Sequence, residues 1–304
     1  MGTTVEFNIP IGNKSAAVVG KICDIAESEV SRLDIMLSIF DKFSTVSKIN
    51  NDYKKSIVKV PLELFQLVKR AKEYFMVTQG LFDITVCPLT EIWGFGPKKE
   101  GRPNIQTISK TLEYIGLDKI ELDEQNGTLI FKDPRVKIDF GGIAKGYAVD
   151  QTVAIFKRRN VTNGLINMGG DLYCMGTNSY NKDWSIGIKD PENKDKILAR
   201  LKIRDKAVAT SGNYENFYIY NKKRYTHIIN PKSGYTVLNN LMSVTIIADD
   251  CTTADALATA VFVLGESKGL ALIEKLADIE CLLVVKRGNR QDILMSKGME
   301  RYVY

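Results

Sequence analysis

The chain has 304 residues, of which 44% are hydrophobic and 26% are charged, proportions typical of a soluble globular protein with a large core. Its 42 basic and 36 acidic residues give a net charge of +6. Short basic clusters such as 157–159 and 222–224 lack the interleaved aromatic residues of a nucleic-acid surface. No apolar run approaches the ~20 residues that cross a bilayer. Composition therefore argues against nucleic-acid-binding and membrane-spanning proteins, and it leaves attraction for an anionic small molecule open.

Apolar spacing predicts a mixture of helices and strands in the first half of the chain. In order, we expect a strand at 3–9, helices at 15–38 and 61–78, a loop-rich stretch at 80–103, a short helix at 109–115 and a hairpin turn at 123–127.

The second half is richer in strands. A helix is expected after the glycines at 141–142, running to about residue 159, and two more are expected at 253–264 and 267–277. Strands are expected on both sides of a Gly-Gly turn within 164–176, and at 184–189, 199–204, 207–210, 217–220, 225–229, 242–248, 282–285 and 293–296. Because helices and strands do not alternate strictly, the pattern favours an α+β fold over a doubly wound sheet. Without internal repeats or a clear linker, we expect a single domain over residues 1–304.

The five cysteines are widely spaced, odd in number and form no C-x-x-C pair. A zinc site or disulfide framework is therefore not expected, and most cysteines should be buried as small apolar residues. The first seven residues show no signal-peptide pattern.

The chain contains one histidine, His227, which precedes an Asn-Pro-Lys-Ser-Gly segment at 230–234. That segment predicts a turn that fixes the direction of the chain. An imidazole transfers protons easily near neutral pH, but one histidine cannot build a metal site from several imidazoles. Taken alone, such a residue is more often an ordinary histidine at a strand end.

Asp255 and Thr259 are four positions apart, so a helix would place both side chains on one face. A carboxylate and a hydroxyl near backbone carbonyls suit a hard cation such as magnesium. The alternative is an aspartate in the first helical turn, where the helix dipole favours an anion, beside an unrelated hydroxyl.

A glycine-rich turn before a helix contains Asp139, Gly141, Gly142 and Lys145. Such glycines let the backbone approach a ligand closely, and Lys145 could reach a phosphate. The segment matches neither the P-loop nor the dinucleotide-binding pattern, so it also fits a simple strand-to-helix turn. Three more segments, 80–86, 167–171 and 210–214, are equally ambiguous when each is taken alone.

Taken together and in order, these segments resemble the ApbE family, the FAD:protein FMN transferases, over essentially the whole chain. The motifs are Gly80-x-Phe82-Asp83-x-Thr85-Val86, Asp139-x-Gly141-Gly142-x-Ala144-Lys145-Gly146-Tyr147-x-x-Asp150, Asn167-x-Gly169-Gly170-Asp171, Thr210-Ser211-Gly212-x-Tyr214, His227-Ile228-Ile229-x-Pro231-x-x-Gly234 and Ala254-Asp255-Ala256-x-Ala258-Thr259.

The resemblance implies an enzyme that binds FAD and magnesium. It would transfer the FMN moiety, through a phosphoester bond, to a threonine or serine hydroxyl of an acceptor flavoprotein and release AMP. Typical acceptors are subunits of redox pumps and extracytoplasmic reductases. The implied fold is α+β, with antiparallel sheets and packed helices in two merged lobes and FAD between them.

The resemblance also assigns site residues. The FAD contacts fall on Met1, Phe40, Leu81, Phe82, Asp83, Asp139, Lys145 and Ile229. The magnesium ligands fall on the Gly142 carbonyl and the side chains of Asp255 and Thr259. His227 falls on the family's histidine beside the flavin phosphate, so His227 and Asp255 are the expected catalytic residues. Phe40 stands where many members have tyrosine, and Asn230, Ser233 and Thr236 are further mild departures.

Attack at phosphorus builds charge on the phosphoryl oxygens, which magnesium and Lys145 would neutralise while His227 acts as general base. Two alternatives use the same residues: a metal-dependent FAD pyrophosphatase, in which water replaces the acceptor, and a non-catalytic FAD-binding protein. Many family members are lipoproteins outside the cytoplasmic membrane. A trimmed extracytoplasmic form and a cytoplasmic protein therefore both stay open.

Overall fold

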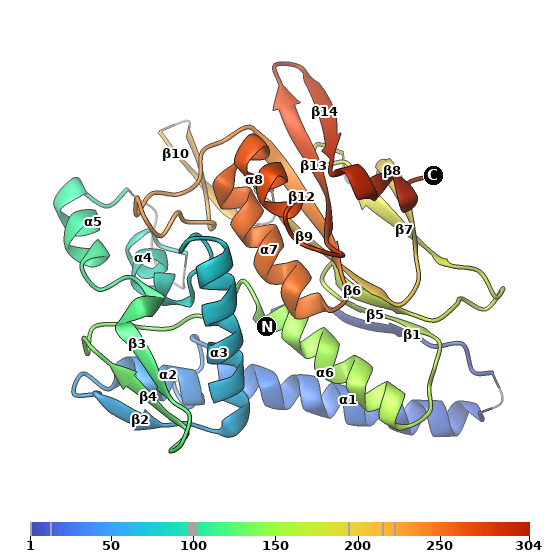
Figure 1. Ribbon diagram of the computed structural model, residues 1–304, viewed down its shortest axis with the longest axis horizontal. Coiled ribbons are helices and arrows are strands. Elements are labelled where there is room, and N and C mark those ends of the chain that lie inside the picture. Colours follow the sequence, from blue (N-terminus) through green and yellow to red (C-terminus); the bar gives the residue numbers. More distant parts are fainter. Residues whose placement is uncertain (1, 13, 96–101, 194, 215, 222) are drawn as a thin grey trace. The chain divides into compact units, whose positions relative to one another are not determined.

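The computed structural model describes residues 2–12, 14–95, 102–193, 195–214, 216–221 and 223–304 (Figure 1). They form two compact units. The first comprises Met1–Asp34, Ile143–Gly212 and Asn240–Tyr304, and the second comprises Ile35–Gly142 and Asn213–Asn239. Each unit is therefore built from separate stretches of chain. The expectation of one domain over 1–304 stays a prediction.

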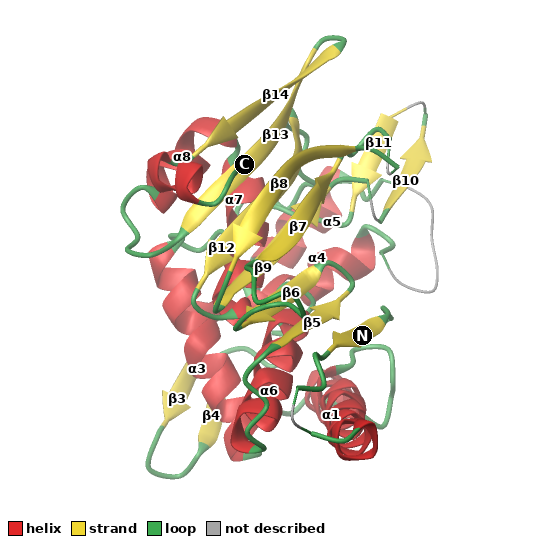
Figure 2. Cartoon of the chain, turned by 90° about the vertical axis from the view of Figure 1, so that its right-hand side faces the viewer, coloured by secondary structure: helices red, strands yellow, loops and turns green. Residues whose placement is uncertain are grey.

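The first unit is organised around a seven-stranded sheet in which every neighbouring pair is antiparallel (Figure 2). Its strands, in spatial order, are β1 (Val5–Asn8), β5 (Gly164–Met168), β6 (Asp171–Met175), β9 (Lys206–Gly212), β12 (Leu241–Ala248), β13 (Glu280–Arg287) and β14 (Arg290–Met295). A two-residue turn joins β5 to β6, and Gly169 and Gly170 have φ values of 62° and 98° there. Paired positive φ values suit a tight hairpin, which explains the two glycines.

Two long helices, α6 (Ala144–Arg158) and α7 (Cys251–Leu264), lie over one face of this sheet (Figure 1). The short helix α8 (Glu266–Ile273) follows α7, and α1 (Ala16–Leu37) follows β1. Helix α7 is apolar over most of its surface, and eleven of its fourteen residues are buried. A helix of that composition belongs inside a protein core.

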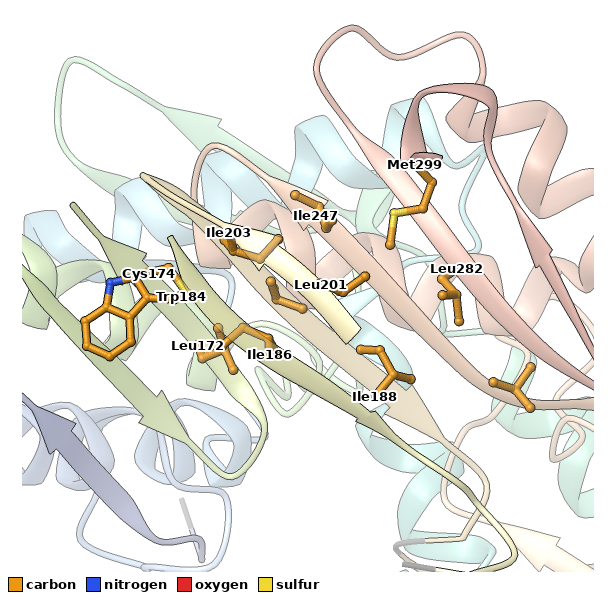
Figure 3. Close-up of a cluster of buried hydrophobic side chains, with 12 residues drawn as sticks. Leu172, Cys174, Trp184, Ile186, Ile188, Leu201, Ile203, Ile247, Leu282 and Met299 are labelled. Atoms are coloured by element: carbon orange, nitrogen blue, oxygen red, sulfur yellow. The ribbon is translucent and has the colours of Figure 1, made fainter. Parts of the chain in front are cut away.

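The opposite face of the sheet is covered by a hairpin of β7 (Trp184–Lys189) and β8 (Ile197–Ile203) (Figure 3). Alternate residues of β7 are buried, so Trp184, Ile186 and Ile188 point into the core. Met299 of the short helix η3 (Lys297–Arg301) joins this cluster. Burying each large apolar side chain contributes about 1.5–3 kcal/mol, so this layer fixes the sheet that carries the site residues on its other face.

The second unit combines short helices with two small sheets. The helices are α2 (Thr45–Asn51), α3 (Leu62–Val77), η1 (Ile84–Val86), α4 (Cys87–Ile92), α5 (Ile105–Leu112) and η2 (Leu117–Lys119). The strands are β2 (Ile57–Lys59), β3 (Ile120–Asp123) and β4 (Thr128–Phe131), which pair antiparallel, and the hairpin strands β10 (Phe217–Tyr220) and β11 (Lys223–Thr226). One apolar cluster of this unit contains Leu89, Trp93, Ile108, Ile115, Tyr225 and Ile229.

The predicted α+β class, the hairpin turn at 123–127 and the helix after the glycines are confirmed. The loop-rich assignment of 80–103 was wrong in part, because η1 and α4 form there and Pro88 sits at the start of α4, where a helix tolerates proline. Helix α5 begins four residues earlier than expected because Asn104 caps it, accepting a hydrogen bond from the Thr107 N–H at 2.8 Å.

Some further details of the fold were not predicted correctly. Helix α2 and strand β2 were not anticipated. Strand β11 ends at Thr226 instead of 229, and Ile229 makes one isolated bridge with Thr236. Four of the five cysteines are buried, as expected, and all five are free. No helix in the described part of the chain is long and apolar enough to cross a membrane.

Candidate functional site

In the first unit, α6 and α7 pack closely against each other at Gly146. A Cβ atom at this position would lie 2.2 Å from the Cys251 carbonyl oxygen and 2.9 Å from Cβ of Asp255. Only glycine lets the two helices approach this closely. Its backbone N–H then donates a hydrogen bond to Oδ2 of Asp255 at 3.1 Å.

Asp150, one helical turn further along α6, fixes the start of α7. Its carboxylate accepts hydrogen bonds from the N–H groups of Cys251 at 2.8 Å and Thr252 at 2.9 Å, and from the Thr252 hydroxyl. Asp250 is the N-cap of the same helix and accepts from the Thr253 N–H at 2.8 Å. Two carboxylates at a helix N-terminus are favoured by the free N–H groups and the helix dipole.

Asp255 is therefore not a first-turn aspartate, which corrects one of the two interpretations of the Asp255–Thr259 pair. It is the fifth residue of α7, and its side chain is only 5% exposed. Helix α7 spans both Asp255 and Thr259, so their spacing of four does place them on one face, as predicted. A buried carboxylate in mid-helix needs a partner other than the helix dipole.

Lys145 is the positively charged residue nearest to the Asp255 carboxylate among the contacts described. Its Nζ donates to Oδ2 of Asp171 and lies 4.0 Å from Oδ1 of Asp255. Asp171 is 1% exposed, and its Oδ1 also accepts from the Thr210 N–H at 3.3 Å. One ammonium group thus faces two buried carboxylates, and Asp150 adds a third acidic group nearby.

The pKa values of the cluster are shifted first by burial and then by the neighbouring charges. Burial, and then the charge of Asp171, raise the pKa of Asp255 to about 7. Burial, and then Asp250, raise the pKa of Asp150 to about 6. Burial alone would lower the pKa of Lys145, but the charges of Asp171 and Asp255 raise it above its ordinary value. The cluster can therefore accept a further positive charge.

Hydroxyl groups from β9, β12 and α7 lie beside the cluster. Oγ1 of Thr259 lies 3.3 Å from Oγ of Ser211, and Oγ1 of Thr210 lies 2.9 Å from Oγ1 of Thr245. Thr259 and Asp255 thus offer oxygen atoms of the kind that magnesium prefers, and Oδ1 of Asp255 is too far from Lys145 for a hydrogen bond.

These donors fit a hard cation with few protein ligands. Among the described residues, no group of three or more His, Cys, Asp or Glu side chains is arranged to hold a metal ion. A magnesium ion would therefore draw on a hydroxyl, a backbone carbonyl and water besides Asp255. Gly142 ends the second unit and directly precedes Ile143, the N-cap of α6, three residues before Lys145.

His227 lies in the second unit, directly after β11, and is half-buried. Its backbone N–H and its ring Nδ1 both contact the carbonyl oxygen of Asn216, at 3.1 Å and 3.0 Å. A carbonyl oxygen can only accept, so the neutral imidazole carries its proton on Nδ1 and has its lone pair on Nε2. The turn after it is also as predicted: Oδ1 of Asn230 accepts from the N–H groups of Lys232 and Ser233.

Asp83, an expected FAD contact, is buried in the second unit. Its Oδ1 accepts hydrogen bonds from the N–H and the hydroxyl of Thr85, at 2.8 Å and 2.7 Å. Burial raises the pKa of Asp83 to about 6 although these hydrogen bonds oppose the shift. The residue therefore organises the start of η1, whatever it contacts besides.

The other expected FAD contacts of this unit differ in exposure. Phe40 is 70% exposed, so its ring is open to a flat ligand, whereas Phe82 is 3% exposed and packs edge-on against Tyr74. Ile229 is buried in the apolar cluster of the unit and Leu81 is half-buried. Asp139 accepts from the Gly141 N–H at 2.9 Å, and burial raises the pKa of its carboxyl. Met1 lies outside the described residues.

The structure thus brings Lys145, Asp255 and Thr259 together in the first unit. The prediction did not name Asp150, Asp171, Thr210 or Ser211 as site residues, although each lies in one of the motifs. Asp150 and Asp171 each end a motif that contains glycines, and this position could have marked them as site residues. The contact of His227 with the Asn216 carbonyl could not be predicted from the sequence, because every residue has a backbone carbonyl.

The fold and site together define an α+β protein with a buried acidic cluster around Lys145 in one unit and a single half-buried histidine in the other. Residues 1–283 match the ApbE family. The chain belongs to this family, and the resemblance seen in its motifs is confirmed.

Relatives with the same architecture are known. The FAD:protein FMN transferase of Haemophilus influenzae is 31% identical over 296 residues, which cover 95% of this chain and 85% of that protein. The solved ApbE protein of Thermotoga maritima has 32% identity and a TM-score of 0.89, covering 100% of this chain and 96% of that one. The flavin transferase ApbE of Vibrio cholerae has 28% identity and a TM-score of 0.86, with coverage of 99% and 96%.

Proposed function

We propose that this chain is a FAD:protein FMN transferase, which moves the FMN moiety of FAD to a threonine or serine hydroxyl of an acceptor flavoprotein and releases AMP. The observation that best supports this proposal is the cluster of Lys145, Asp255 and Thr259 in a chain that belongs to the ApbE family. A cluster of this kind suits phosphoryl transfer, which needs positioning and charge neutralisation more than covalent chemistry.

In the proposed reaction, the acceptor hydroxyl oxygen attacks the phosphorus of the FMN half. A new phosphorus–oxygen bond forms, the bond from this phosphorus to the bridging oxygen of the diphosphate breaks, and AMP departs with that oxygen. Nε2 of His227 takes the hydroxyl proton, because Nδ1 is already committed to the Asn216 carbonyl. The ammonium of Lys145 attracts the diphosphate and offsets charge that builds in the transition state.

Magnesium is part of the proposal. Asp255 and Thr259 would hold it with the Gly142 carbonyl, and when bound it supplies positive charge at the diphosphate. The support is the pair of raised carboxyl pKa values and the hard oxygen donors described above. Asp255 is therefore assigned to the metal and, through it, to catalysis.

The flavin contacts are proposed from the family assignment. They comprise Met1, Phe40, Leu81, Phe82, Asp83, Asp139, Lys145 and Ile229. The exposed ring of Phe40 supports a stacking contact with the isoalloxazine, since an aromatic face prefers a flat partner. Buried Phe82 and Asp83 would instead act on the flavin site through the packing and hydrogen bonds at the start of η1.

The test is incubation with FAD and magnesium, with and without a flavoprotein acceptor fragment of a redox pump. Intact mass and released AMP are measured. A mass gain of one FMN on the acceptor with an equal amount of AMP supports the transferase. FMN and AMP without an adduct would favour a FAD pyrophosphatase, and unaltered FAD in both samples would favour a flavin-binding protein.

A further inference from the structure

Four aromatic rings of the second unit form a continuous column that ends beside His227. Trp93 stacks on Tyr225 with ring centroids 5.6 Å apart, and Tyr225 stacks on Tyr218 at 5.4 Å. Tyr218 contacts Phe95 at 5.2 Å, and Phe95 meets the His227 ring at 6.4 Å with an angle of 70° between the planes. The last contact has the edge-to-face geometry that aromatic rings favour.

The far end of the column is fixed in the core. Trp93 is 1% exposed, and its indole Nε1 donates to the Gly234 carbonyl at 2.7 Å. Tyr225 is 7% exposed and lies opposite Tyr218 in the β10–β11 register. Phe95 itself is half-buried, two residues after Trp93. The Phe95 ring that contacts His227 therefore packs on half-buried Tyr218, at the end of a column whose other two rings are buried.

His227 is restrained in two directions by these contacts. The Asn216 carbonyl holds Nδ1, and the Phe95 ring limits rotation of the imidazole about its bond to Cβ. Loss of the Phe95 ring would remove one of these restraints and allow the imidazole to rotate further from the carbonyl. With both restraints, the basic lone pair stays on Nε2.

We infer that Phe95 is a positioning residue, which keeps the imidazole of His227 against the Asn216 carbonyl in the tautomer protonated on Nδ1. The expected effect of Phe95 on turnover rests on the proposed function. The tautomer itself can be measured whether or not the chain transfers FMN. Phe95 is not among the site residues that the family resemblance assigns.

The first measurement exploits the single histidine of the chain. In protein labelled with ¹⁵N-histidine, one imidazole gives the two ring-nitrogen signals, and their shifts identify the protonated nitrogen. At a pH where the ring is neutral, we expect the Nδ1–H tautomer to dominate in the wild type. In Phe95→Leu, which removes the ring, the signals should move toward a mixture of tautomers, and Phe95→Tyr should restore the wild-type pattern.

The second measurement is transfer kinetics with the same acceptor fragment. Phe95→Leu should lower kcat about tenfold, because a misplaced base loses part of its contribution, and it should leave KM for FAD nearly unchanged. Phe7→Leu is the matched control, since Phe7 forms an edge-on pair with Phe156 at 5.4 Å in the first unit. That variant loses an equivalent ring contact and should keep the wild-type kcat and tautomer.

Three results would overturn the inference: a wild-type ring protonated on Nε2, a Phe95→Leu protein with unchanged tautomer, or equal losses of kcat in Phe95→Leu and Phe7→Leu. A wild-type ring protonated on Nε2 overturns the inference even if Phe95→Leu fails to fold, and Phe95→Met then supplies the comparison of tautomers. If the spectra behave as expected while no variant, including the wild type, transfers FMN, the proposed function fails and the positioning role stands.

Discussion

The backbone N–H of Gly146 donates a hydrogen bond to Oδ2 of Asp255 across 109 positions of sequence. This contact joins the helix that carries Lys145 to the helix that carries Asp255 and Thr259. The same glycine leaves no room for a side chain, since its Cβ would collide with the Cys251 carbonyl. Helix packing and the geometry of the acidic cluster therefore depend on one residue.

Gly146→Ala should destabilise the protein although alanine is the better helix former. Pushing α6 away from α7 should cost about 1–3 kcal/mol in the free energy of unfolding, measured by urea denaturation. Gly20→Ala is the matched control, because Gly20 also lies in a helix but a Cβ there meets nothing within 4 Å. That variant should gain up to about 1 kcal/mol. Equal effects of the two changes would contradict the packing argument.

Asp255→Asn should weaken magnesium binding. The amide keeps the volume and can still accept from Gly146, but it lacks the charge, so we expect the magnesium midpoint to rise at least about tenfold. Calorimetric titration of magnesium into the FAD complex measures binding apart from turnover. Asp249→Asn removes an exposed carboxylate paired with Lys206 and should leave the midpoint in place. An unchanged midpoint in Asp255→Asn would exclude this residue as a ligand.

His227→Ala should lower FMN transfer by a factor of about 10²–10⁴, the usual contribution of a general base. FAD binding, followed by flavin fluorescence, should be nearly unchanged, because the proposed role of the imidazole is toward the acceptor hydroxyl. Transfer is read from the mass of the acceptor and from AMP release. Full transfer by the alanine variant would remove His227 from the mechanism.

Asp83 makes stability depend on pH. Its pKa is raised from 3.8 to about 6 in the folded protein, chiefly by burial, so the folded state holds the proton more tightly than the unfolded state. Below about pH 4 the carboxyl is protonated in both states and does not lower the free energy of unfolding. As pH rises from about 4 to about 6, its ionisation lowers the free energy of unfolding, by roughly 3 kcal/mol above about pH 6. Asp83→Asn keeps an oxygen acceptor for Thr85 without this titration.

The stability of the wild type relative to Asp83→Asn should thus fall between pH 4 and pH 6.5. Urea unfolding of both proteins at several pH values, without FAD, measures the difference. A difference that is constant over this range would show that the carboxyl has an ordinary pKa in the folded protein.

Local sequence patterns predicted many of the helices, strands and turns of the fold. The Gly-Gly turn between β5 and β6 and the hairpin between β3 and β4 follow from backbone preferences of a few residues, and both were predicted. Helix α4 was missed because its six residues are too few to show a helical period. The Ile228–Ile229 pair was assigned to a strand since apolar pairs occur in strands and cores alike.

By itself, the sequence determined the family, the α+β class and the common helical face of Asp255 and Thr259, because ordered motifs and residue spacing are local properties. Only the tertiary structure decided that Asp150 caps α7, that Lys145 pairs with Asp171 and that His227 donates to Asn216. Strand pairing and helix packing bring those partners together, and contacts between distant segments leave no periodic trace in a single chain. The charge balance of the acidic cluster likewise arises from those contacts.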